Sequence, residues 1–202
     1  MAKNVLFISY DGMCDPLGQS QVIPYLTGLS LLGYQITIIS AEKPATFLKE
    51  SKNIQMLLRR SNIQWKHVEF SNQIPGWSAW NNYLRLKKIA ERMFQSESFD
   101  LVHCRSYIPA ILGLYLKEKF GAKMIFDMRG FWADERVEGN LWSLTNPVYK
   151  AAYNFFKKKE IQLLNESDAI VSLTENAKKE MLTWEQLEIP SEKITVIPCC
   201  AD

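Results

Sequence analysis

The sequence lacks an excess of charge of either sign. Its 202 residues contain 24 lysines and arginines and 22 aspartates and glutamates, for a formal net charge of +2. Because the positive and negative charges nearly cancel, the protein has no strong overall electrostatic field. This balance excludes the broad basic surface that is typical of nucleic-acid binding. We therefore expect no nucleic-acid partner, and any charged contact with a ligand must be local.

The sequence also lacks a long hydrophobic run. Its apolar stretches are too short and too often interrupted for the roughly 20 residues that a membrane-spanning helix needs. The N-terminal MAKNVLFISYDG enters a strand-like run at once, without the features of a signal peptide. These absences predict a cytoplasmic location. Lys157, Lys158 and Lys159 lie beside aromatic residues and leave a peripheral contact with the inner membrane face open, although a solvated helix face is the more common explanation.

Cysteine is scarce and follows no pattern. Cys14, Cys104, Cys199 and Cys200 have neither C-x-x-C spacing nor the density of a disulfide-stabilised scaffold. The adjacent Cys199 and Cys200 could form a redox pair or bind a soft metal, but without a nearby histidine they make a poor zinc site. We expect ordinary thiols and no metal site.

What the sequence does contain is an alternation of short β-branched runs and longer segments of helical period. This alternation is typical of a parallel sheet covered by helices on both faces. Helix signals include residues 107–120, closed by Gly121, and a cap at Asn146 before Pro147. The expected strands are 5–9, 35–40, 63–70, 100–104, 124–128, 169–173 and 194–197. The predicted fold class is α/β, with a Rossmann-like, doubly wound and mostly parallel sheet of about seven strands.

The loop after the first expected strand, SYDGMCDPLGQSQVIPYL, contains two glycines. In an open parallel sheet, ligands bind beyond the carboxyl ends of the strands. Gly12 and Gly18 would let the backbone approach a ligand there, and the following helix would offer N–H groups to a phosphate. The spacing matches neither G-x-G-x-x-G nor a nucleoside-triphosphate-binding loop, so a plain long turn remains an equal alternative.

His103 and Arg105 end the fourth expected strand and point to the same side of it. The imidazole could contact a substrate hydroxyl, although a lone histidine in an apolar strand is more often a satisfied core residue. The guanidinium could bind a phosphate or carboxylate, or form only a surface ion pair.

The stretch FDMRGFWADER, residues 126–136, combines aromatic rings, carboxylates and guanidinium groups. A sugar ring could stack on Trp132 while Asp127 and Arg129 take its hydroxyls. Two exposed aromatic residues would be unusual on a plain surface loop, which favours a function for this stretch.

Two further features are interpreted as unrelated to catalysis. Trp77 and Trp80 flank a helical segment and are expected to pack in the core. Asp134 and Glu135 are adjacent and would point apart, so they do not form the opposed carboxylate pair of a glycoside hydrolase.

These residues together resemble the N-terminal domain of a family 4 (group 1) glycosyltransferase, of the GT-B class with two Rossmann-like domains. The resemblance covers the whole chain. Its most specific part is the first loop and helix, Asp15 to Gln21, Pro24-Tyr25-Leu26 and Gly28-Leu29, followed by Asp127 to Trp132 and the closing Ile197-Pro198 with Asp202.

The resemblance implies the acceptor-binding half of a retaining, hexosyl-type transferase of carbohydrate biosynthesis. Such an enzyme moves a sugar from a nucleotide-diphosphate sugar to a hydroxyl of a glycan, lipid or polysaccharide precursor, with no metal and no cofactor besides the donor. The implied site residues are His103 and Asp127 in catalysis, Gly12, Gly18 and Gln19 at the donor diphosphate, and Arg105, Arg129, Trp132 and Glu135 at the substrates.

The sequence departs from the family pattern in three places. His103-Cys104-Arg105 stands where members commonly have His-x-His, and Cys199-Cys200 replaces the usual Asn-Gly. The nucleotide-binding C-terminal domain is absent from these residues, so 1–202 is expected to be a single N-terminal domain without activity of its own.

The sequence leaves two alternatives to a transferase half. The first is a non-catalytic glycan- or phosphosugar-binding module, or a subunit whose partner chain brings the donor pocket. The second, a nicotinamide-dependent oxidoreductase, is disfavoured because the first loop lacks the compact glycine fingerprint. If the loop binds the donor, Gly18→Val should weaken nucleotide-sugar use more than folding.

Overall fold

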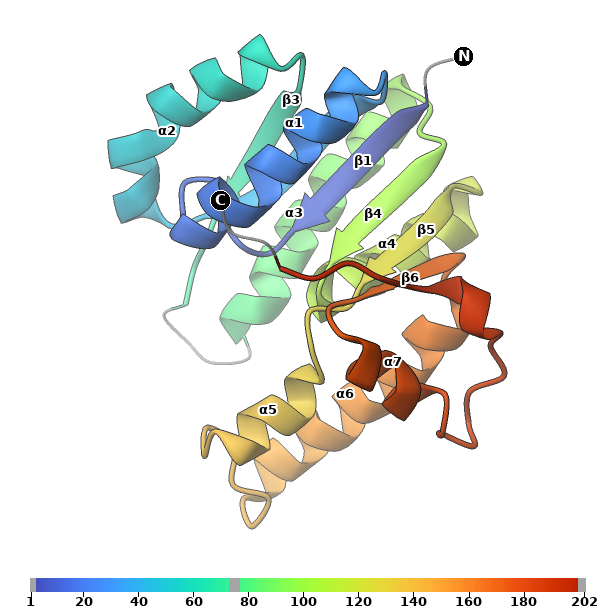
Figure 1. Cartoon of the computed structure of the whole chain (residues 1–202). Helices are drawn as coiled ribbons and strands as arrows, with labels where there is room; N and C mark the ends of the chain where they lie inside the picture. The colour runs from blue at the N-terminus through green and yellow to red at the C-terminus, as the bar shows by residue number, and fades with distance from the viewer. Residues whose placement is uncertain (1–2, 73–76, 200–202) are drawn as a thin grey trace.

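The computed structural model describes residues 3–72 and 77–199 and contains one parallel seven-stranded sheet (Figure 1). The strand order is β3-β2-β1-β4-β5-β6-β7, and every neighbouring pair is parallel. The strands are β1 (Asn4–Ser9), β2 (Gln35–Glu42), β3 (Gln64–Glu69), β4 (Leu101–Arg105), β5 (Lys123–Asp127), β6 (Ala169–Ser172) and β7 (Ile194–Val196). All of the expected strands are confirmed, each to within two residues at either end.

Helices connect successive strands. The longer ones are α1 (Ile23–Leu31), α2 (Pro44–Arg60), α3 (Trp77–Ser96), α4 (Tyr107–Phe120) and α6 (Pro147–Glu166), and the shorter ones are α5 (Trp132–Glu138), α7 (Glu175–Met181) and the 3-10 turn η2 (Ser191–Lys193). The expected end of α4 is confirmed, because Gly121 has φ +75°, a conformation that favours glycine. Asn146 caps α6 as expected by accepting a hydrogen bond from the Val148 N–H at 2.9 Å.

The sheet is covered on both faces, as the alternation of the sequence predicts (Figure 1). One apolar cluster joins β1 and β2 to α1 and α2 through Phe7, Leu26, Ile38 and Leu58. A larger cluster on the other face packs α3, α4 and α6 against the central strands. Each face of the central strands is therefore buried, which accounts for their nearly continuous apolar sequences.

The chain reverses its direction across the sheet between β1 and β4. From β1 it continues outward to β2 and β3, and then returns to β4 on the other side of β1. The helices that follow β1 and β4 therefore diverge to opposite faces, which leaves a crevice at the carboxyl ends of these two strands. Ligands of open α/β sheets bind at such a switch point.

Candidate functional site

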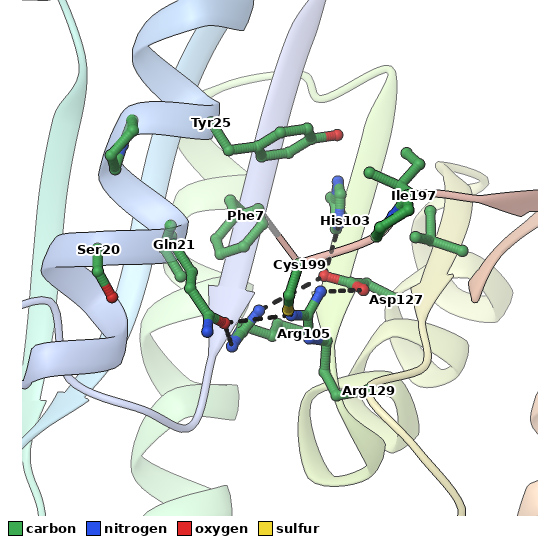
Figure 2. Close-up of a pocket in the computed structure, with 14 residues that line it drawn as sticks. Phe7, Ser20, Gln21, Tyr25, His103, Arg105, Asp127, Arg129, Ile197 and Cys199 are labelled. Carbon is green, nitrogen blue, oxygen red and sulfur yellow. Dashed lines mark hydrogen bonds and ion pairs between the residues drawn. The ribbon is translucent and has the colours of Figure 1, made fainter. Parts of the chain in front are cut away.

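A cavity of about 260 Å³ opens at this switch point (Figure 2). Side chains from β1, β4, β5, the start of α1 and the segment after β7 surround it. The lining residues are Phe7, Ser20, Gln21, Val22, Pro24, Tyr25, His103, Arg105, Asp127, Arg129, Val171, Ile197, Pro198 and Cys199. We call it the switch-point cavity.

Strand register brings the polar residues of the cavity together. His103 and Arg105 alternate along β4 and so face the same side of the sheet, and Arg105 is the direct partner of Asp127 on β5. His103 Nε2 lies 3.5 Å from Asp127 Oδ2, and Arg105 Nη1 lies 4.0 Å from the same oxygen. Arg129, two residues beyond β5, donates a hydrogen bond to Asp127 Oδ1 at 3.4 Å. The predicted residues His103, Arg105, Asp127 and Arg129 therefore form one cluster.

Gln21 completes this cluster from the opposite wall. Its side-chain oxygen accepts one hydrogen bond from Arg105 Nη2 at 2.9 Å and another from Arg129 Nη2 at 3.1 Å (Figure 2). Gln21 belongs to η1 (Gly18–Val22), a π-helical turn that leads into α1. Irregular helical turns of this kind are frequent at functional sites. One neutral amide oxygen thus holds two guanidinium groups side by side.

The charged groups of the cluster are deeply buried. The side chains of His103, Arg105 and Asp127 are only 4%, 6% and 8% exposed. Burial by itself would raise the pKa of the Asp127 carboxyl, but His103, Arg129 and Arg105 together hold that pKa below its usual range. Burial and the nearby Arg129 lower the pKa of Arg105, although an arginine keeps its charge in proteins. The cluster therefore contains a carboxylate and two guanidinium cations.

Two buried nitrogen atoms of the cluster, His103 Nε2 and Arg105 Nε, form no hydrogen bond of good geometry among the described residues. Each faces a carboxylate oxygen at 3.5 Å, on Asp127 and on Asp11 respectively. A buried polar atom whose hydrogen bond is not made costs about 1 to 3 kcal/mol. Contact of His103 with a substrate hydroxyl stays a prediction, and its side chain lines the switch-point cavity. Buried nitrogen atoms of this kind are suited to a ligand that brings its own acceptor groups.

The walls of the cavity include aromatic and C-terminal residues to which the sequence assigned no role. The rings of Phe7 and Tyr25 lie 4.8 Å and 5.9 Å from the His103 ring, measured between centroids. The Cys199 thiol accepts a hydrogen bond from Arg129 Nη2. Tyr25 and Gln21 lie within the first-helix motif of the resemblance, which is the only sequence signal that could have pointed to them.

The opening loop differs from the expectation that its amides are free. The Met13 and Cys14 N–H groups donate hydrogen bonds to the two carboxylate oxygens of Glu42, at 2.6 and 3.1 Å. The Ser40 hydroxyl donates to Glu42 as well. Gln19 donates its backbone N–H to the Asp15 carbonyl and its side-chain amide to the Cys14 carbonyl. The prediction that the loop offers free N–H groups is therefore wrong for Met13, Cys14 and Gln19.

The glycines of this loop are required by close backbone packing. A Cβ atom on Gly18 would lie 2.2 Å from the Gly12 carbonyl oxygen, and one on Gly12 would lie 2.6 Å from a Glu42 oxygen. Neither glycine lines the switch-point cavity, and Gln19 does not line it either. Binding of a donor diphosphate by Gly12, Gly18 and Gln19 stays a prediction.

Trp132 and Glu135 lie apart from the cluster. The expected loop after Arg129 is in fact helix α5, which carries both residues away from the cavity. Trp132 lines a separate hollow, while the Glu135 carboxylate packs against Gly130, where a Cβ would lie 2.0 Å from Glu135 Oε1. Asp134 points elsewhere, toward Tyr153 and Lys157, as expected of a residue that forms no carboxylate pair with Glu135.

The structure also bears on the two tryptophans of α3 and on the lysines of α6. Trp80 is 56% exposed and stacks on Tyr83 at 5.4 Å, so its assignment to the core is wrong, whereas the side chain of Trp77 lies outside the described residues. Lys157 pairs with Asp134 at 2.8 Å and with Glu160, which removes one of three lysines from any membrane contact.

Residues 3–72 and 77–199 bring together no group of histidine, cysteine or acidic residues able to bind a metal ion. None of the helices described there is both long and apolar enough to cross a membrane.

Solved structures with a similar fold are glycosyltransferases of the GT-B class. HepE from Anabaena, solved with UDP and glucose, has a TM-score of 0.60 at 14% identity, covering 99% of this chain and 45% of its own. Sucrose-phosphate synthase from Thermosynechococcus elongatus has a TM-score of 0.65 at 10% identity, covering 98% and 48%. UGT89C1 from Arabidopsis thaliana, solved with UDP-L-rhamnose, has a TM-score of 0.57 at 16% identity, covering 98% and 52%. The chain spans about half the length of these proteins, and at such identities the likeness shows the fold.

The sequence itself gives the family. The profile of Glycosyltransferase Family 4 matches residues 22–202, and the chain belongs to this family. No curated protein sequence matches it significantly. The family resemblance drawn from the first loop and the 127–132 stretch is thus confirmed, as is the Rossmann-like fold.

Proposed function

We propose that this chain is the acceptor-binding N-terminal domain of a retaining glycosyltransferase, of hexosyl type, that uses a nucleotide-diphosphate sugar. The observation that carries the proposal is the cluster of buried charged and polar side chains in a cavity at the switch point of the sheet, in which His103 Nε2 and Arg105 Nε face carboxylates at 3.5 Å without a hydrogen bond of good geometry among the described residues. Membership of the family supports the reaction class. A following domain, with the nucleotide pocket, would complete the site.

Each polar or charged residue of the cluster has a separate role in the proposed reaction. Arg105 and Arg129 stabilise negative charge on the donor phosphates or on the sugar as the glycosidic bond breaks. Asp127 offsets the repulsion between the two guanidinium groups by contacting both, while the Gln21 amide fixes them from the other wall. His103 Nε2 contacts a sugar hydroxyl or the reacting oxygen. Fixed charges of this kind need no reorganisation during the reaction, which is the source of their catalytic effect.

The donor is proposed to be a nucleotide sugar. Among the proteins of similar fold, HepE is solved with UDP and glucose and UGT89C1 with UDP-L-rhamnose. The acceptor is proposed to be a hydroxyl of a glycan, lipid or polysaccharide precursor, used in the cytoplasm, with a peripheral membrane contact as a further element. No resident metal or cofactor enters this scheme, because the departing phosphate can itself help to deprotonate the acceptor.

The test is nucleotide release by the full-length protein. A panel of UDP-, GDP- and ADP-sugars is incubated with hydroxyl acceptors, and nucleoside diphosphate formation is measured. We expect one donor to be consumed in an acceptor-dependent way, and NMR of the product to show the same anomeric configuration as the donor. An inverted product would disprove the retaining mechanism and leave the transferase assignment intact.

A non-catalytic role predicts a different result. A glycan- or phosphosugar-binding module would bind sugar ligands in calorimetric titration yet consume no donor. Full-length protein that binds such ligands and releases no nucleotide from any donor would replace the transferase proposal with this alternative. Micromolar binding of a nicotinamide cofactor would favour an oxidoreductase instead.

A further inference from the structure

A second hollow lies beside the switch-point cavity. It has a volume of about 150 Å³ and is lined by residues from the first loop, the start of α4 and helix α5: Tyr10, Asp11, Ser106, Tyr107, Ile108, Pro109, Trp132 and Arg136. We call it the Trp132 hollow. The family resemblance implies a substrate contact for Trp132, but the sequence indicates no role for Arg136 or for the hollow itself.

The Arg136 guanidinium is the unusual group in this hollow. It stacks on the Trp132 ring, 4.4 Å from the centroid, and lies 5.8 Å from the Trp142 ring. Its Nε is buried without a hydrogen-bond partner, and within the described ranges the guanidinium forms no ion pair. Aromatic stacking holds this planar cation in place while leaving its charge uncompensated.

Three carboxylates near the hollow are engaged with other cations, among them Glu160, which accepts a hydrogen bond from Tyr107 and pairs with Lys157. Asp11, which lines the hollow and is 45% exposed, lies 3.5 Å from Arg105 Nε. Asp134 on α5 accepts hydrogen bonds from Tyr153 and Lys157. The positive charge of Arg136 is therefore available to an external anion, and a guanidinium binds phosphate or carboxylate with two parallel hydrogen bonds.

The position of the hollow relates it to the proposed reaction. Ser106 directly follows Arg105, and Asp11 pairs with Arg105, so the Asp11–Arg105 pair separates the hollow from the switch-point cavity. A ligand whose anionic group rests on Arg136 can extend past this pair toward Asp127 and His103. The hollow is therefore placed to hold one end of an acceptor whose other end reaches the reacting groups.

We infer that the Trp132 hollow binds an anionic group of the acceptor, a phosphate or a carboxylate, and that Arg136 is the residue that recognises it. This inference rests on the proposed function and narrows its acceptor to molecules that carry an anion close to the reacting hydroxyl. The phosphate can belong to a free phosphosugar-like molecule or to a lipid headgroup, because both present the same chemistry to Arg136.

The test measures binding by the full-length protein without any nucleotide sugar. Glycerol phosphate is titrated by calorimetry, with glycerol as the uncharged comparison, and vesicles of phosphatidylcholine with and without phosphatidic acid are tested by sedimentation. We expect glycerol phosphate, phosphatidic acid vesicles or both to bind, and Arg136→Gln to weaken that binding at least tenfold. Arg59→Gln, at an exposed arginine of α2, is the matched control and should bind as the wild type does.

Arg136→Lys separates recognition from packing. It keeps the positive charge, so it should bind better than Arg136→Gln, with both variants folded by circular dichroism. Equal losses in the two variants together with lowered melting temperatures would assign Arg136 to packing and overturn the inference. Wild-type binding by Arg136→Gln, or loss of binding only in Arg129→Gln, would overturn it as well.

These readouts are independent of catalysis. If no donor is consumed but Arg136→Gln still loses glycerol phosphate binding, the transferase proposal fails and the anion site stands. If acceptor-dependent nucleotide release is found and the KM for anionic acceptors is unchanged in Arg136→Gln, the inference about the hollow is the part that fails.

Discussion

The opening loop and the switch-point cluster are each arranged around a buried carboxylate, and the two carboxylates differ in how well their surroundings are satisfied. Glu42, at the end of β2, accepts hydrogen bonds from the Met13 and Cys14 N–H groups of the loop and from the Ser40 hydroxyl, so the groups around it are satisfied within the protein. Asp127 lies beside His103, Arg105 and Arg129, and His103 Nε2 and Arg105 Nε form no hydrogen bond of good geometry in the described part of the chain, although each faces a carboxylate at 3.5 Å.

This difference separates a structural role from a functional one. A satisfied buried network rigidifies a fold, whereas an incompletely satisfied one costs free energy that folding alone does not explain. The described hydrogen bonds of the opening loop are satisfied within the protein, so we expect its residues to matter mainly for stability. We expect the cluster at the ends of β4 and β5 to be the region that contacts a ligand, as proposed above.

The largest effect is expected from Asp127→Asn in the full-length enzyme. Loss of the negative charge leaves the repulsion between Arg105 and Arg129 uncompensated, and we expect kcat to fall about 100-fold or more, the range found for removal of a fixed electrostatic group. The release of nucleoside diphosphate measures this. Glu118→Gln, at an exposed carboxylate on α4, should leave kcat unchanged. A kcat within threefold of wild type in Asp127→Asn would remove this residue from the active site.

Glu42→Gln should show the reverse pattern. The substitution turns one acceptor oxygen into an NH₂ group that faces a buried N–H, so the free energy of unfolding should fall by about 2 to 4 kcal/mol. Urea denaturation measures the loss. If Glu42→Gln were as stable as wild type and lost nucleotide-sugar affinity instead, the structural role of Glu42 would be contradicted.

Gly18→Ala should have the next largest effect, a loss of stability. The added Cβ would lie 2.2 Å from the Gly12 oxygen and 2.7 Å from Met13 Cα, both backbone atoms, so the loop must shift. Overpacking of this kind costs about 1 to 3 kcal/mol of stability. A valine at this position makes the same Cβ contact. We therefore expect Gly18→Val to weaken folding more than nucleotide-sugar use, which is the reverse of the order expected from the sequence.

Gly28→Ala is the control for Gly18→Ala. No atom lies within 4 Å of a Cβ at Gly28, which sits inside α1, so the change should raise stability by roughly 0.5 to 1 kcal/mol through helix propensity. Thermal melts of the two variants, run side by side, test the packing argument. Equal stability of both would contradict it.

The smallest effect is a pH dependence. Because the pKa of Asp127 is lower in the folded protein, the ionised carboxylate stabilises the fold above its unfolded pKa, and this stabilisation is lost as the pH falls through the lower, folded pKa. The stability advantage of wild type over Asp127→Asn should therefore be present at pH 7 and shrink in acid. Urea denaturation at pH 7, 5 and 3 measures it, and an advantage that grew on acidification would have the wrong sign.

The fold was predictable because local sequence patterns identify its strands. Short β-branched runs and their alternation with helical segments locate the strands, and parallel pairing then places the residues after β4 and β5 at one edge. His103, Arg105, Asp127 and Arg129 could be grouped on that basis alone.

The partners of these residues were not predictable in the same way. Gln21 bonds to residues 84 and 108 positions away, and Glu42 reaches back 29 and 28 positions to Met13 and Cys14. Such contacts depend on how helices and loops pack over the sheet, which local patterns do not encode. The position of Trp132 outside the cluster was not predictable either, because it depends on how α5 packs and places Trp132 at a different hollow.

The most direct test is a structure of the full-length protein bound to its nucleotide sugar. The account predicts oxygen atoms of the ligand about 3 Å from both His103 Nε2 and Arg105 Nε, with Glu42 still bonded to the Met13 and Cys14 amides. A ligand bound to those two amides after Glu42 has released them, with no ligand atom near His103 Nε2 or Arg105 Nε, would contradict this expectation.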